Sequence, residues 1–547
     1  MLDGNLQGRR RFLQNAALFS TGLVTSLAST RLARANDETI EAVVIGSGFG
    51  GAVAALRLGQ AGIKTLIIER GRRWSIIDST TNSTFATFRQ PDRRAAWLSP
   101  MTWEGIPTGE IYTGVLETKH ENGISVLCGA GVGGGSLVYN GITYQPTREL
   151  FYKVFPKEID YNEMDSVYYP RARSIIKAAP IPQDILATDY YLATRAFLQE
   201  AANAELRGSL LDIAVDWDIV RQEINGTKVP STILGEHWYG INSGAKNSLD
   251  RSYLAQAENT GNVEILPLHI VTEISEVTGY GYKIKCSQIN ESGETIATKT
   301  ITCKHLFLAA GSMGTSALLV KAKATGTLPR LNDYIGLDWG SNGDTSVIRS
   351  GIPLTTSIQG IGQGGPASAV IEYFDNPLNP ISIQFYSRWN APQGILISLC
   401  MGIPSVKGRF NYDSTTGSVK LTWPGNKRSG DPDIQRALEF AYRLIDRKNS
   451  ISTGKTKTEI IPGSYPLRKN TVTEDISDTL TAHPLGGAVL GKACDLYGRV
   501  VGYRGLYVVD GALIPGSAGS TNPSLTVAAL AERCMERILA EDIAALR

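Results

Sequence analysis

Short runs of consecutive apolar residues recur along this chain, and each leads into a glycine or an acidic residue. The runs span residues 42–45, 66–68, 306–310 and 506–509, and Lys64 and Thr65 extend the second as a strand. A continuous apolar run is typical of a strand that is buried on both faces of a parallel sheet. The first run is followed, after several glycines, by an alanine- and leucine-rich stretch of helical character. These patterns predict an α/β fold with a Rossmann-like domain.

A second pattern dominates the region between residues 369 and 422. Strand-like stretches with turn residues between them span residues 369–373, 381–386, 395–400 and 418–422. Such a series is typical of antiparallel strands. We therefore expect a discontinuous α+β lobe that contains a large antiparallel sheet and covers a site on the first domain.

Composition narrows the function classes. The 547 residues include 54 Lys plus Arg against 52 Asp plus Glu, a formal charge of +2 without a clustered basic face. A nucleic-acid partner is therefore not expected. The six cysteines show no CxxC pair and no metal-ligand spacing, so the sequence predicts neither a metal site nor a disulfide scaffold. The 57 glycines, about one residue in ten, gather at residues 46–51, 129–135, 362–365 and 486–519.

The first 35 residues have the character of an export signal. Arg9 and Arg10 precede Phe12 and Leu13, an uncharged stretch follows, and small residues end the segment at Ala35. This order resembles a twin-arginine signal peptide, with cleavage after Ala35. We expect export by the twin-arginine machinery to the periplasm or the medium. An uncleaved membrane anchor and an amphipathic helix are the alternatives.

The turn after the first apolar run has the residues of a dinucleotide-binding site. Gly46 permits a tight turn, Gly48 lets backbone N–H groups approach a pyrophosphate, and Gly51 lets helix and strand pack closely. Glu69 ends the second strand and can accept both ribose hydroxyls, which argues against a 2′-phosphate and leaves FAD or NAD. The expected contacts are Gly46, Ser47, Gly48, Phe49, Gly50, Gly51 and Glu69.

Two further glycine segments favour FAD over NAD. A rigid flavin ring laid against backbone needs a second segment that approaches without side chains, and an NAD enzyme does not. The strand at residues 306–310 ends at Gly311, which has the form of a third contact segment. The second contact segment is the glycine-rich stretch that begins at Gly129. It supplies the candidates Gly131, Gly133, Gly134, Gly135, Ser136 and Asn140.

The carboxyl-terminal region holds the candidate catalytic residues. His483, one of five histidines, precedes a proline and a glycine pair, which suits a rigidly held ring. Asp510 and Gly511 follow the last apolar run. Asn522 and Pro523 then open a helix, whose amino terminus directs partial positive charge at whatever lies before it.

Together these motifs resemble the glucose–methanol–choline (GMC) family of flavin oxidoreductases, and most closely its branch of bacterial cholesterol oxidases with non-covalent FAD. The resemblance implies that His483 accepts or orients the hydroxyl of a secondary alcohol and that Asn522 hydrogen-bonds the same oxygen. Hydride then passes to the flavin, and O2 is the expected electron acceptor, giving H2O2. The resemblance adds Val271, Asp510, Gly511, Asn522 and Pro523 to the cofactor contacts.

The resemblance also implies a substrate class. An apolar alcohol, most specifically a 3β-hydroxysteroid, would enter by transient contact with a membrane surface. Sterol oxidases use a glutamate to move a proton from the 5-ene to the 4-ene ketone, and Glu372 is the matching residue here; the alternative is an edge-strand glutamate in water. Three expected aromatic positions hold Val370, Ala482 and Ser524 instead, which puts the substrate in doubt more than the chemistry.

The cofactor motifs are spread along the chain, so the domains must be discontinuous. We expect residues 36–155, 240–330 and 462–547 to form the FAD-binding domain, and residues 156–239 and 331–461 to form the substrate-binding domain. Two other functions stay open. One is a dehydrogenase of another alcohol with a quinone or cytochrome acceptor, and the other is a flavin-bearing lipid-binding protein without turnover.

Overall fold

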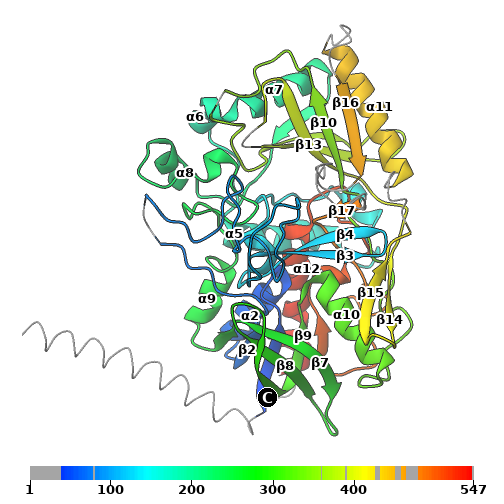
Figure 1. The fold of residues 1–547 in the computed structure, drawn as a ribbon. Helices are drawn as coiled ribbons and strands as arrows, with labels where there is room; N and C mark the ends of the chain where they lie inside the picture. Colours follow the sequence, from blue (N-terminus) through cyan, green and yellow to red (C-terminus); the bar gives the residue numbers. More distant parts are fainter. Residues whose placement is uncertain are drawn as a thin grey trace, which may run out of the picture.

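The computed structural model describes residues 39–77, 80–358, 360–388, 391–424, 431–449, 457–462 and 479–544. Two sheets organise it, one in the lower and one in the upper part of Figure 1, with a smaller sheet between them. The expected signal peptide, residues 1–35, lies outside these described residues. Within them, no helix is both long and apolar enough to cross a membrane.

The first sheet is the predicted Rossmann-like one. Its strand order is β6-β2-β1-β9-β8-β7, with β18 paired to β9 on its other side. Strands β6, β2, β1, the end of β9, and β18 run parallel, while β7 and β8 form an antiparallel extension. The bounds are β1 Ile40–Ile45, β2 Thr65–Ile68, β6 Val263–Leu266, β7 His269–Glu276, β8 Tyr282–Ile289, β9 Thr295–Leu308 and β18 Leu506–Val508.

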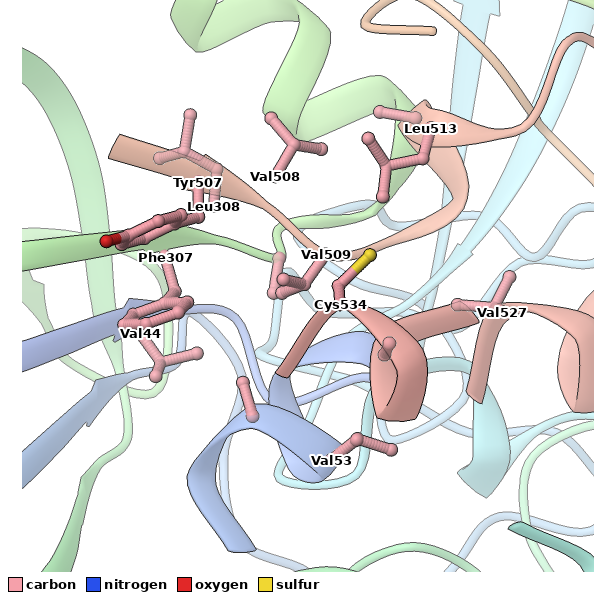
Figure 2. Close-up of a cluster of buried hydrophobic side chains, with 14 of the residues drawn as sticks. Val44, Val53, Phe307, Leu308, Tyr507, Val508, Val509, Leu513, Val527 and Cys534 are labelled. Carbon is pink, nitrogen blue, oxygen red and sulfur yellow. The ribbon is translucent and has the colours of Figure 1, made fainter. Parts of the chain in front are cut away.

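The apolar runs of the sequence form the centre of this sheet. Val44, Phe307 and Tyr507 lie on adjacent strands, and the rings of Phe307 and Tyr507 stack with centroids 4.6 Å apart (Figure 2). Helices α2 (Phe49–Gln60), α9 (Tyr253–Asn259) and α12 (Pro523–Ile538) pack together at this core. Burial of these side chains removes apolar surface from water, which is the main force that holds the domain together.

A buried ion pair fixes the two long helices to each other. The guanidinium of Arg57 on α2 donates to the carboxylate of Glu532 on α12 at 2.6 Å. The Glu532 side chain is fully buried and also accepts a hydrogen bond from the Tyr253 hydroxyl at 2.8 Å. Removal of Arg57 would leave the buried Glu532 carboxylate with only the Tyr253 hydroxyl and the more distant Arg171 guanidinium, at 3.7 Å, which is costly.

The second sheet is antiparallel, as predicted, with the order β16-β10-β13-β12-β11-β5. The predicted stretch 418–422 differs, because β15 (Ser418–Thr422) pairs with β14 (Arg409–Asp413) in a separate hairpin. Helix α11 (Pro432–Lys448) packs on this sheet, and Asp431 caps its amino terminus. The bounds are β5 Arg207–Leu210, β10 Thr345–Ser350, β11 Ala369–Tyr373, β12 Ile381–Tyr386, β13 Ile395–Met401, β16 Lys457–Pro462, α7 Leu192–Asn203 and α11 Pro432–Lys448.

The two faces of strand β12 have different roles. Ile381, Ile383 and Phe385 alternate toward a core that includes residues of α7 and α11. Ser382 and Gln384 point the other way, and the Ser382 hydroxyl donates to the carbonyl of Ser520 at 2.7 Å. One face of the sheet is therefore packed on its own helices, and the other meets the loop that leads into α12.

A three-stranded sheet of order β17-β4-β3 connects the two parts, with bounds β3 Leu116–Glu121, β4 Ile124–Gly129 and β17 Thr479–Thr481. Residues 161–176, expected in the substrate lobe, pack instead with the core of the first domain. The domain boundaries themselves stay a prediction. The remaining helices are α3 Arg148–Tyr152, α4 Tyr161–Glu163, α5 Tyr169–Ile176, α6 Gln183–Leu186, α8 Trp217–Ile224 and α10 Gly311–Ala324.

Candidate active site

One elongated cavity of about 600 Å³ runs along the carboxyl ends of the parallel strands and continues under the antiparallel sheet. This edge is where open α/β sheets bind their ligands. Most of the residues predicted from the sequence line it: Gly46, Ser47, Gly48, Phe49, Gly50, Glu69, Gly134, Gly135, Asn140, Val271, Gly311, His483, Asp510, Gly511, Asn522 and Pro523.

Four predicted cofactor residues lie behind the lining and support it. The hydroxyl oxygen of Ser47 accepts the N–H of Gly133 at 3.1 Å and lies 3.3 Å from the carbonyl of Gly131. The Ser136 hydroxyl donates to the Gly133 carbonyl at 2.7 Å. The fourth, Gly51, packs so closely on the Gly46 carbonyl that a Cβ would overlap it. These residues hold the two glycine loops together.

Glu69 joins the same loops from the end of β2. One carboxylate oxygen accepts the backbone N–H and the hydroxyl of Ser47, at 3.0 and 2.6 Å, and the other accepts the Gly71 N–H at 2.8 Å. The side chain is buried at the cavity edge. The acid predicted to bind a ribose therefore also fixes the first turn of the loop.

The glycines divide into two groups by what lies beside them. A Cβ on Gly46 or Gly50 would overlap the backbone of Ala309 or Val509, so these two positions permit packing. Gly46 also has a φ of +98°, a conformation that favours glycine. Gly48 and Gly135 face open space within the cavity lining. A side chain there would occupy the volume of a ligand.

His483 is held by a carboxylate that the sequence did not reveal. Its Nδ1 lies 2.7 Å from Oδ1 of Asp344, whose side chain is fully buried just before β10. The other carboxylate oxygen accepts the Thr481 hydroxyl at 2.8 Å. With Nδ1 donating to Asp344, the Nε2 lone pair of neutral His483 is available to the cavity. This is the arrangement that orients a histidine as a general base.

Asn522 reaches the same cavity from the loop before α12. Asn342 fixes this loop, because its amide donates to the Thr521 carbonyl at 2.8 Å and its carbonyl accepts the Ala518 N–H at 2.8 Å. The Asn522 Oδ1 accepts a hydrogen bond from Gln384 Nε2 on β12 at 2.5 Å. Neither Asn342 nor Gln384 was singled out as a site residue from the sequence.

A buried lysine connects two walls of the cavity. The ammonium of Lys246 donates to the carbonyls of Leu137, Tyr139 and His237 at 2.9, 2.7 and 3.2 Å. It thereby ties the segment before Asn140 to the segment that carries Trp238, and both segments line the cavity. Burial lowers the pKa of Lys246 to about 7. A second buried group, Asp510, has its pKa raised to about 6 by burial.

Glu372 does not line this cavity. Its carboxylate accepts the Tyr144 hydroxyl at 2.6 Å and pairs with the Arg207 guanidinium at 2.9 Å. The strand β11 that carries it lies beside the edge strand β5, one strand farther along the sheet than Gln384. The role of Glu372 as an isomerisation base stays a prediction.

The sequence of this chain matches two profiles described as GMC oxidoreductase. The first covers residues 40–327 and the second covers residues 406–531. The chain belongs to the GMC oxidoreductase family. It is therefore an FAD-dependent oxidoreductase that acts on an alcohol.

Individual relatives are distant but cover nearly the whole chain. Cholesterol oxidase of Mycobacterium tuberculosis is 26% identical and aligns over 90% of both chains. Cholesterol oxidase of Acinetobacter baumannii is 24% identical over 92% of this chain and 95% of that one. Pyridoxine 4-oxidase from Mesorbium loti shares the fold, with a TM-score of 0.62 at 14% identity over 92% of this chain and 100% of that one.

The cavity fits the FAD that the GMC family uses. Gly48 and Gly135 leave open space where backbone would lie against the cofactor, and the buried Oδ1 of Asn140 has no hydrogen-bond partner in the described part of the chain. The amino terminus of α12 adds partial positive charge. When bound, FAD supplies the hydride acceptor.

The residues of this chain can then do the proton chemistry at the alcohol. We propose that His483 Nε2 accepts the hydroxyl proton and that the buried Asp344 stabilises the imidazolium that forms. Asn522 lines the same cavity, and we propose that it holds the alcohol oxygen.

Substitution of the two kinds of glycine should have different effects. We expect Gly48→Ala to leave stability within about 1 kcal/mol of wild type and to weaken FAD binding about tenfold or more, because its methyl group enters the cavity. Gly50→Ala should lower the free energy of unfolding by about 2 kcal/mol, because its methyl group overlaps the Val509 carbonyl. Urea unfolding of the apoprotein and FAD titration measure both. Equal effects of the two variants would contradict this division.

Replacement of the carboxylate behind His483 should reduce activity and move its pH dependence. We expect Asp344→Asn to lower kcat about 10- to 100-fold, because the neutral amide no longer stabilises the imidazolium. The acidic limb of the pH–rate profile should move to lower pH, since the unprotonated ring is then easier to maintain. Asp333→Asn, at an exposed ion pair with Lys323, is the control. An unchanged profile in Asp344→Asn would refute the assigned role.

Proposed function

We propose that this chain is an exported oxidase of a bulky apolar secondary alcohol, with a 3β-hydroxysteroid as the best candidate and O2 as the electron acceptor. The observation that carries the proposal is the pair His483 and Asn522, which open together into a cavity whose nearby walls are apolar. Trp238, Leu399 and Ile142 line these walls.

The wall at Trp238 is broad and rigid. Trp238 stacks on Trp103 with ring centroids 4.5 Å apart and meets Tyr386 edge to face at 5.8 Å. Stacked aromatic rings lose little conformational freedom when they bind a flat apolar ligand. Ala482 and Ser524, two of the positions where larger aromatics were expected, also line the cavity and widen it. Val370, the third, is buried in the core behind Ile142 and is not itself among the lining residues.

The curated relatives support the steroid class. Three of the matched proteins are named cholesterol oxidases, at 24–26% identity and with at least 90% of this chain aligned. Another, the long-chain-alcohol oxidase FAO3 of Arabidopsis thaliana, is 22% identical and aligns over 91% of this chain and 67% of that one. The names of these four relatives all refer to apolar alcohols, which is the substrate class that we propose.

Isomerisation of the product is a separate question. The residue of the antiparallel sheet that touches Asn522 is the neutral Gln384, and both oxygens of Glu372 are engaged by Tyr144 and Arg207. Glu372 is also absent from the residues that line the cavity, so its carboxylate is not placed to reach a bound substrate. We therefore propose that the ketone leaves mainly as the unconjugated 5-ene.

Export remains part of the proposal because of the leader. The paired arginines Arg9 and Arg10 and the small residues up to Ala35 support twin-arginine export to the periplasm or medium. This pathway carries folded proteins, which suits a chain that must enclose FAD before export. Transient contact with a membrane surface would supply an apolar substrate.

An assay of alcohols under air tests the proposed activity. Purified holoenzyme should produce H2O2 and the ketone in equal amounts from 3β-hydroxysteroids, with kcat/KM at least about 100-fold above that for small secondary alcohols, because only the larger substrate fills the apolar walls. Absorbance of a conjugated enone should lag far behind peroxide.

Other outcomes identify the other functions. Turnover with a quinone or cytochrome but without peroxide would identify a dehydrogenase. FAD that no alcohol reduces, and activity unchanged in His483→Ala and Asn522→Ala, would identify a flavin-bearing lipid-binding protein. Conjugated enone formed as fast as peroxide, and lost in Glu372→Gln, would restore Glu372 as the isomerisation base.

A further inference from the structure

Asn522 stands at the cap position of α12 but does not cap it. Four other helices, α3, α4, α8 and α11, are preceded by the cap residues Thr147, Asp160, Asp216 and Asp431, and each of these side chains accepts a backbone N–H of the first turn. Asn522 has the same extended backbone, with φ −66° and ψ 138°, yet its side chain makes no such bond. Asparagine is among the best capping residues, so another interaction must divert it.

Gln384 is the residue that diverts it. Its Nε2 donates to Asn522 Oδ1 at 2.5 Å, and its side chain comes from the interior strand β12 of the opposite sheet. Gln384 is 0% exposed and Asn522 is 5% exposed, so water does not compete for this bond. A hydrogen bond between two buried amides fixes the orientation of both.

The diverted amide leaves two sets of donors directed at the cavity. With Oδ1 engaged, Asn522 Nδ2 has no hydrogen-bond partner within the described residues, and Asn522 lines the cavity. The first N–H groups of α12, a helix of 16 residues, are likewise not capped by the Asn522 side chain, and Ser524 of this first turn lines the same cavity. Both sets can bind electronegative atoms there.

We propose that Gln384 is a positioning residue that holds Asn522 in its donor orientation and keeps the amino terminus of α12 free for the cofactor. The inference rests on the proposed alcohol oxidation for its effect on turnover. Its effect on the helix terminus does not depend on any substrate. The antiparallel sheet would thus control both the substrate-binding amide and the charge beside FAD.

The opposite orientation of the two amides gives a different prediction. If Gln384 accepted a hydrogen bond from Asn522 Nδ2, then Asn522 would present an acceptor to the alcohol oxygen. Gln384→Glu separates these cases because a carboxylate can only accept. If Gln384 donates to Asn522 Oδ1, as in the structure, the glutamate makes the Asn522 amide rotate, and kcat falls about 100-fold. If Gln384 instead accepts from Asn522 Nδ2, the glutamate keeps that bond, and activity is preserved.

The main test is a double-mutant cycle with a second measurement on the flavin. We expect Gln384→Met to lower kcat about tenfold and to lower the reduction potential of bound FAD, because the released Asn522 can now cap α12. In an Asn522→Ala background, the same Gln384→Met change should alter kcat by no more than about twofold. It should alter the equilibrium constant for reduction of bound FAD by no more than about twofold as well. Gln363→Met replaces another buried glutamine, which donates to the Ile395 carbonyl, and is the matched control.

Each result decides the inference. Loss of kcat and of potential that disappears in the Asn522→Ala background supports it, as does inactive Gln384→Glu that still binds FAD and unfolds at the wild-type temperature. Equal losses in both backgrounds, or an active Gln384→Glu, would overturn it. If the Gln384→Met variant does not fold, the activity of the Gln384→Glu variant and the reduction potential of its bound FAD decide the inference. If no alcohol is oxidised, the proposed function fails, while the potentials still decide the role of Gln384.

Discussion

The backbone of the first βα turn lies against the backbone of two other strand ends, and the site depends on this contact. Side chains at Gly46 and Gly50 would overlap the carbonyls that follow β9 and β18, so only bare backbone lets these three segments meet. The contact places the amino terminus of α2, the end of β9 and the loop after β18 along one cavity. A GMC enzyme needs that edge closed tightly enough for backbone donors to face FAD.

The same constraint explains why the candidate catalytic residues depend on the antiparallel sheet. His483 and Asn522 come from loops in which glycine and proline set the backbone but offer few side chains to hold a neighbour. The groups that orient them, Asp344 and Gln384, come from the start of β10 and from β12. Substrate-facing geometry is thus assembled at the interface of the two sheets, and precise placement of this kind contributes much of an enzyme's rate.

Local sequence patterns predicted the strands and turns, because their conformation depends on residues that are adjacent in the chain. The apolar runs at residues 42–45 and 506–509 became the predicted parallel strands, and the glycine turns fell on the cavity, because strand burial and turn conformation leave marks at adjacent positions. Asp344 and Gln384 left no such mark, since each acts on a partner 139 or 138 residues away. Glu372 was chosen from the family resemblance, and a match along the sequence cannot show that its carboxylate contacts Tyr144 and Arg207.

The central claim is that a secondary alcohol bound between His483 and Asn522 donates its hydride to the FAD of this chain. Anaerobic stopped-flow reduction with a 3β-hydroxysteroid, protonated or deuterated at the carbinol carbon, tests it most directly. The account predicts complete bleaching of the flavin, a deuterium isotope effect of about 2 or more on its rate, and loss of most of that rate in both His483→Ala and Asn522→Ala. Bleaching that is insensitive to deuterium and to both substitutions would contradict it.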